Sequence, residues 1–141
     1  MKQTIHFTLP APYPLQSAKK FMPATLYTKM KKAMRGTIIA ALGGPQNIPS
    51  KPFSYAHIRI ERWSVEKPSQ EALEGGGAPS LIESLTAFQR GVQGVYRTPY
   101  GLGIIKDASP AHITVEYRAI PCHFSEQKTV VTIKDTGEME P

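Results

Sequence analysis

The sequence predicts a single α+β domain with the element order β-α-β-α-β-β, a mainly antiparallel sheet and two helices on one side of it. Three observations support this: short runs in which apolar and polar residues alternate, one stretch in which apolar residues recur about once per helical turn, and Gly or Pro clusters between these runs. A chain of 141 residues can bury one core of its own. We expect residues 1–134 to form this domain and residues 135–141 to form a polar tail.

The first predicted strand runs from Thr4 to Leu9, where apolar residues alternate with polar ones. Prolines at positions 10, 12 and 14 end it. Residues 15–24 then form an irregular basic loop that carries Lys19 and Lys20.

An amphipathic helix follows from Thr25, and Gly43-Gly44-Pro45 ends it. Its apolar positions lie about one turn apart, at Leu26, Met30, Met34, Ile38 and Leu42. Its other positions include four cations: Lys29, Lys31, Lys32 and Arg35. These cations fit two interpretations equally, a surface that follows a phosphate backbone or an ordinary solvated helix face.

The second half of the chain contains the remaining elements. A second strand runs from Ala56 to Ile60 and can extend to Val65, and a connection rich in Gly and acidic residues covers positions 69–79. Ser80 and Glu83 have the spacing of a capping box, which predicts the start of a short helix reaching Phe88. We expect residues 89–100 to be a loop or a frayed helix end. Two final strands are predicted at residues 113–119 and 129–133.

Charge and composition restrict the classes of function. The formal net charge of +6 favours an anionic partner, most commonly nucleic acid. The single cysteine, Cys122, excludes an internal disulfide and a zinc site made of thiolates, and fits a reducing cytoplasm. The four histidines lack a paired metal-binding spacing, and no apolar run is long enough to span a membrane. We therefore expect a cytoplasmic protein without a membrane partner.

Asp107 lies in the segment with the most information about function. It stands between the apolar pair Ile104-Ile105 and the strand that begins near His112, with Pro110 between them. This position predicts a tight connection into the strand. The carboxylate then has two possible uses, to bond backbone amides and close the turn, or to bind a metal ion.

Four segments together resemble the RusA family of Holliday junction resolvases. They are the first strand with its proline-rich exit, the strand through Arg59 and Glu61, the run Leu81-Ile-Glu83-Ser-Leu85 after a Gly-rich stretch, and the run from Gly103 to Pro110. The resemblance implies a small homodimer, found in phages and prophages, that cuts branched DNA in a magnesium-dependent reaction. It also implies a cluster of aspartates in each subunit that holds Mg²⁺.

The acidic motif of this chain differs from the family pattern. The family's Asp-Asp pair is Lys106-Asp107 here, and the lysine that follows its Asp-x-Asp-Asn-Leu motif is absent. That motif corresponds either to Ser69-Gln-Glu71-Ala-Leu73 or, if the run from Leu81 to Leu85 is kept in register, to positions without an acid, at Ala72 or within residues 77–79. The resemblance thus implies Asp107 and Glu71 as catalytic metal ligands, with Glu83 as a further ligand. One carboxylate alone holds Mg²⁺ poorly, and Lys106 would either lower cation affinity or replace part of the metal's charge. Glu83 also fits a capping role, and Glu71 fits an ordinary solvated acid.

Two functions follow as expectations. The first is a RusA-type endonuclease acting on Holliday junctions or other branched DNA during recombination or replication. The alternative is a catalytically inactive RusA-like homodimer that binds nucleic acid or another protein. In either case the resemblance and the charge pattern point to one set of residues for phosphate contact: Lys19, Lys20, Lys29, Lys31, Lys32, Arg35 and Lys106.

Overall fold

The computed structural model describes residues 3–16 and 22–137. These residues form an α+β domain around a sheet with the strand order β1-β6-β2-β5. The strands are β1 (Thr4–Leu9), β2 (Ala56–Ser64), β5 (Ile113–Pro121) and β6 (Lys128–Asp135). The β1-β6 and β6-β2 pairs are antiparallel, whereas the β2-β5 pair is parallel. The predicted fold class is confirmed; Lys19, Lys20 and residues 138–141 of the expected tail lie outside the described residues.

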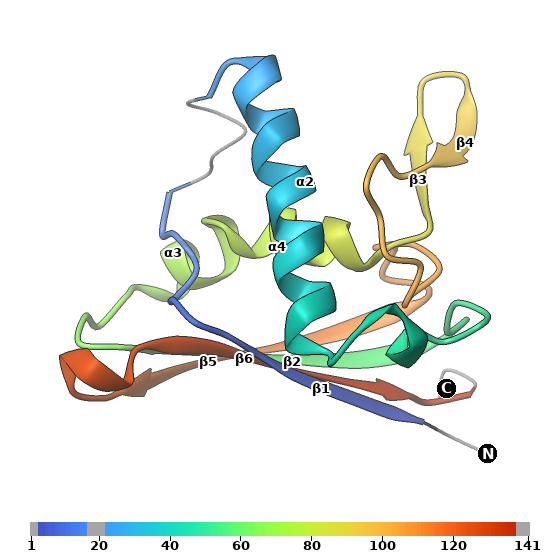
Figure 1. Ribbon diagram of the computed structural model, residues 1–141. Coiled ribbons are helices and arrows are strands. Elements are labelled where there is room, and N and C mark those ends of the chain that lie inside the picture. The colour runs from blue at the N-terminus through green and yellow to red at the C-terminus, as the bar shows by residue number, and fades with distance from the viewer. Residues whose placement is uncertain (1–2, 17–21, 138–141) are drawn as a thin grey trace.

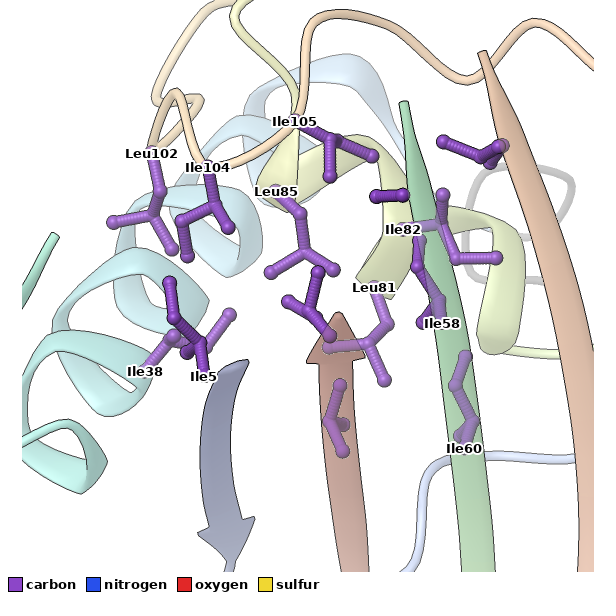
Figure 2. Close-up of a cluster of buried hydrophobic side chains, with 14 of the residues drawn as sticks. Ile5, Ile38, Ile58, Ile60, Leu81, Ile82, Leu85, Leu102, Ile104 and Ile105 are labelled. Carbon is purple, nitrogen blue, oxygen red and sulfur yellow. The ribbon is translucent and has the colours of Figure 1, made fainter. Parts of the chain in front are cut away.

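The helices α2 (Ala24–Ala41), α3 (Gln70–Gly75) and α4 (Ala78–Leu85) lie over one face of this sheet (Figure 1). Alternation in β2 buries Ile58 and Ile60 against them, as predicted, and both are fully buried. Figure 2 shows both among the buried side chains of the core, with Ile58 near Leu81 and Ile82 of α4. The core therefore lies between the sheet and the helical layer.

Helix α2 matches the predicted helix closely. Its Ile38 is fully buried, whereas Leu26, on the same predicted apolar stripe, is 50% exposed. The reason is visible in Figure 1: the C-terminal part of α2 lies against the sheet and its N-terminal part extends away from it. The N-terminal half of α2 thus forms part of the molecular surface.

The capping box predicted at Ser80 and Glu83 is wrong. Helix α4 begins at Ala78 with Gly77 as its N-cap, so both residues lie inside the helix. The preceding connection also holds a short helix, α3, whose start is capped by Ser69: its hydroxyl accepts a hydrogen bond of 3.1 Å from the backbone nitrogen of Ala72. The prediction placed the N-cap of this helix three residues too late along the chain, at Ser80 instead of Gly77.

The loop or frayed helix end expected at residues 89–100 is a β-hairpin instead. Strands β3 (Phe88–Gly91) and β4 (Gly94–Arg97) pair as a separate two-stranded sheet. Val92 and Gln93 form the turn, and Gly94 takes a positive φ of 115°, which favours glycine. The hairpin stands clear of the main sheet, beside α2 (Figure 1).

None of the helices formed by residues 3–16 and 22–137 is both long enough and apolar enough to cross a membrane.

Candidate nucleic-acid interface

An open pocket of about 350 Å³ lies at the base of the hairpin. Glu83 and Thr86 line it from the end of α4, and Asp107 to Ser109 line it from the turn before β5. The hairpin contributes its remaining wall, through Phe88, Gln89, Arg90 and Tyr96. The fold therefore brings two of the predicted site residues, Glu83 and Asp107, into one pocket.

Asp107 is positioned by the segment immediately before it. Ile104 and Ile105 are fully buried, and the backbone around them is bonded on two sides. On one side the backbone nitrogen of Phe53 donates to the Ile104 carbonyl at 2.8 Å, and on the other the nitrogen of Ala87 donates to the Ile105 carbonyl at 2.9 Å. This anchoring fixes where the chain enters the turn and hence where the Asp107 carboxylate lies.

The Asp107 carboxylate closes the turn into β5. Its Oδ1 accepts a hydrogen bond of 2.9 Å from the Ser109 backbone nitrogen and lies 2.7 Å from Nδ1 of His112. Burial opposes ionisation, but the bonds from His112 and Ser109, together with the nearby Lys106 cation, outweigh it and hold the pKa of Asp107 below its ordinary value. These contacts match the turn-closing interpretation of this residue.

Glu83 is held by three side chains from two other elements. Its Oε2 accepts a hydrogen bond of 3.1 Å from the Tyr27 hydroxyl and lies 3.4 Å from Nζ of Lys31, while Gln89 donates to Oε1. Burial raises the pKa of Glu83. The Lys31 cation and the hydrogen bonds from Gln89 and Tyr27 lower it by more, so the pKa lies below its ordinary value. Glu83 is thus an ionised residue whose charge is neutralised inside the protein.

Lys31 was expected to contact phosphates, and the structure places it elsewhere. Its side chain is only 5% exposed. Its ammonium donates to the Ser80 carbonyl and to the Ser84 hydroxyl, both at 2.8 Å, in addition to pairing with Glu83. Lys31 connects α2 to α4, so it does not contribute to the positive surface.

The three acids proposed as metal ligands are not gathered at one point. Glu71 is exposed in the first turn of α3, outside the pocket that Glu83 and Asp107 share. Within the described parts of the chain, no group of three or more His, Cys, Asp or Glu residues is arranged to hold a metal ion. Glu83 and Asp107 also direct carboxylate oxygens at internal donors. This donor set does not fit Mg²⁺, which needs several oxygen ligands at once.

The predicted cations that the structure places at the surface lie on α2 and in the turn before β5. Lys29 and Lys32 are exposed on α2, while Arg35 is partly buried and donates from Nη1 to the Gly101 carbonyl at 2.7 Å. Lys106 is exposed next to Asp107. Of the predicted cations, these four are therefore placed at or near the surface.

Sequence reasoning missed two further cations, Arg90 and Arg97, both exposed on the hairpin. Arg90 lines the pocket, and Arg97 pairs with Phe88 across the hairpin. The signal that could have found them is the Gly91-Val-Gln-Gly94 run, in which two glycines frame a two-residue turn.

A smaller pocket of about 170 Å³ lies between α2 and the hairpin. Tyr27, Thr28 and Tyr100 are among its lining residues. It shares Glu83, Gln89 and Tyr96 with the larger pocket, so the two adjoin. We refer to this pair of pockets as the hairpin groove.

Comparison of the chain with family models, with curated proteins and with solved structures finds no match.

Proposed function

We propose that this protein is a nucleic-acid-binding module that contacts phosphates through α2 and the β3-β4 hairpin. The observation that carries the proposal is the distribution of charge around the hairpin groove. Exposed cations lie on both of its sides, whereas its two acids, Glu83 and Asp107, are engaged by internal partners.

The positive charge comes from two segments that lack acidic residues. Positions 24–41, which form α2, contain four cations and no acid; positions 86–106 contain Arg90, Arg97 and Lys106 and no acid. Lys31 is neutralised by Glu83 inside the protein, which leaves the others to set the surface potential. A surface with an excess of positive charge attracts a polyanion and speeds its association.

Lys32 extends this charge along the groove. It lies one helical turn after Thr28, a residue that lines the smaller pocket, so the two share a side of α2. Arg90 lines the larger pocket from the opposite side. A nucleic-acid backbone lying across the groove would therefore meet cations at both edges.

A salt titration of binding tests the proposal. Fluorescence anisotropy of a labelled duplex and a labelled four-way junction is measured over a series of KCl concentrations for wild type, Arg90→Gln, Arg97→Gln and Lys32→Gln. We expect log Kd to rise linearly with log salt, and each substitution to reduce the slope by about 1, because each removes one phosphate contact.

The matched control is Lys67→Gln, which removes an exposed cation just after β2, away from the groove. It should leave the slope unchanged. Binding that is insensitive to salt, or an equal effect of the Lys67 and Arg90 substitutions, contradicts the proposal.

A second candidate function is the RusA-type endonuclease, because Glu83 and Asp107 line the same pocket. Since these two carboxylates alone do not fit Mg²⁺, this function would need further oxygen ligands from water or from the substrate phosphate. Incubating a labelled four-way junction with the protein and Mg²⁺ or Mn²⁺ tests it. Cleavage that Asp107→Asn abolishes supports an enzyme. Binding without cleavage, unaffected by Asp107→Asn, rejects it and leaves the binding module.

The homodimer is a further part of the RusA-like proposal. Light scattering of the purified protein distinguishes a dimer from a monomer. A monomer at all concentrations used for binding would remove the dimer from the proposal without affecting the phosphate contacts.

A further inference from the structure

We propose that the hairpin groove binds an unpaired nucleobase, which stacks on the ring of Tyr96. This inference rests on the proposed nucleic-acid binding and specifies which form of nucleic acid the site selects. In this inference Tyr96 stacks on the base, the hairpin arginines contact the phosphates, and the pocket at the base of the hairpin holds the base edges.

Tyr96 is an exposed aromatic residue in a well-defined position. Half of its surface is accessible, although it lies in a strand. A Cβ built on Gly91 would lie 2.7 Å from Cε1 of Tyr96, which shows that the ring packs directly over the glycine backbone on the neighbouring strand. An aromatic ring held against one strand and exposed to solvent offers a flat surface for a base.

The register of the hairpin separates stacking from phosphate contact. Gln89 pairs with Tyr96 on one face, and the pairs Phe88-Arg97 and Arg90-Val95 lie on the other, because paired residues of an antiparallel ladder share a face. Tyr96 and Gln89 line both pockets of the groove, whereas Phe88 and Arg90, from the other face, line only the larger one. The arginines are therefore placed to hold the backbone of a strand whose base turns into the groove.

The larger pocket has the size and polarity for a base. Its volume of about 350 Å³ exceeds that of a single nucleobase ring system, and it is open to solvent. Phe88 adds a second aromatic wall, and Gln89 and Ser109 add polar groups for the base edges. Aromatic faces beside polar side chains are typical of sites that recognise unstacked bases.

This geometry favours an unpaired nucleotide over an intact duplex. A base in a duplex is stacked on its neighbours and cannot enter a pocket beside a protein strand without leaving that stack. Single strands, bulges and the centres of branched molecules already contain such bases. An acidic peptide would satisfy the arginines but has no flat ring for Tyr96, so it is the competing occupant that the experiment must exclude.

The test uses a duplex with one bulged 2-aminopurine and the same duplex fully paired. Anisotropy gives the affinity, and 2-aminopurine fluorescence reports stacking on an aromatic ring. Wild type should bind the bulged duplex more tightly than the paired one and quench its fluorescence. Tyr96→Ala should lose about tenfold to a hundredfold in affinity for the bulged duplex and abolish the quenching, whereas Tyr96→Phe should retain both.

Two further variants complete the design. Phe124→Ala removes an aromatic side chain that is 81% exposed in the turn before β6, and it should behave as wild type. Gly91→Ala keeps Tyr96 but displaces its ring, because the new Cβ would contact the ring at 2.7 Å. It should reproduce part of the Tyr96→Ala defect, and circular dichroism checks that each variant is folded.

The outcomes separate this inference from the function on which it rests. Salt-dependent binding that Tyr96→Ala leaves unchanged, with equal affinity for bulged and paired duplexes, overturns base stacking and retains phosphate contact. A complete lack of nucleic-acid binding overturns both. Displacement of the bulged duplex by poly-glutamate at equal charge concentration would identify an acidic peptide as the better ligand and also overturn base stacking.

Discussion

Lys31 Nζ lies 3.4 Å from Glu83 Oε2, with the lysine side chain 5% exposed and the glutamate side chain 26% exposed. This ion pair joins the surface part of α2 to the helix that ends at the candidate site. It thereby fixes the position of Glu83 and removes one positive charge from the surface. The pair is a structural element of the groove.

Breaking this pair should destabilise the protein. Lys31→Met leaves Glu83 without its buried cation and should lower the free energy of unfolding by about 3 kcal/mol. The double variant Lys31→Met/Glu83→Gln should lose less than the sum of the single variants, with a coupling of about 1 kcal/mol or more. Urea unfolding measures the stability of Lys31→Met, of Glu83→Gln and of the double variant. Lys32→Met, at the exposed neighbouring position, is the control and should change stability by less than about 0.5 kcal/mol. Additive single effects would show that the two charges are not coupled.

The contribution of Asp107 should depend on pH. Its pKa is lowered in the folded protein, so its carboxylate stabilises the fold above the unfolded-state pKa and this stability is lost as the pH falls through the folded-state pKa. Asp107→Asn should therefore lower the free energy of unfolding at pH 7 by about 1.5–3 kcal/mol, the usual size for a hydrogen bond to a charged group. The difference between variant and wild type should shrink at pH values below the ordinary range of aspartate.

Urea unfolding at a series of pH values measures this dependence. The control is Asp135→Asn, at the end of β6, which should show a smaller effect at pH 7. A constant difference between Asp107→Asn and wild type across the series would contradict the assignment of the effect to ionisation.

Glycine at position 101 should be required by the packing around the site. A Cβ there would lie 2.2 Å from the Thr86 carbonyl oxygen and 2.8 Å from Cβ of Thr98, so the backbone must shift to accept alanine. Gly101→Ala should lower the free energy of unfolding by about 2 kcal/mol.

Gly36→Ala is the matched control, since nothing lies within 4 Å of its added Cβ in the middle of α2. Gly36→Ala should stabilise the protein by about 0.5–1 kcal/mol. Thermal unfolding monitored by circular dichroism compares the two, and equal effects would contradict this packing argument.

The sequence predicts the sheet well because burial produces a pattern. Residues of β1 and β2 alternate between the core and solvent, and their predicted starts at Thr4 and Ala56 agree with the structure. The hairpin has no such pattern, because Val92, Val95 and Tyr96 are all exposed. Periodicity reports burial on one face, and a hairpin whose residues are mostly exposed shows little of it.

Within the candidate site, the place of a residue between predicted elements indicated its structural role better than its residue type did. Asp107 was expected in a tight connection before a strand, and it closes that turn. Lys31 was expected at the surface because lysine usually is, and its burial depends on Ser80, Ser84 and Glu83 in a helix far away in the sequence. A single sequence contains no signal for a partner at that separation.

The position of β6 sets the order in which this domain can be completed. β6 is the last strand of the described chain, yet it lies between β1 and β2 in the sheet. Until the ribosome has released residues 128–135, the first strand has no neighbour to pair with, and β2 lacks one of its two partners. The final sheet must therefore form after synthesis of most of the chain, in a single late step with large loop closure. A nascent chain stalled before residue 128 would leave the hydrogen-bonding edge of β1 unpaired and present a target for chaperones.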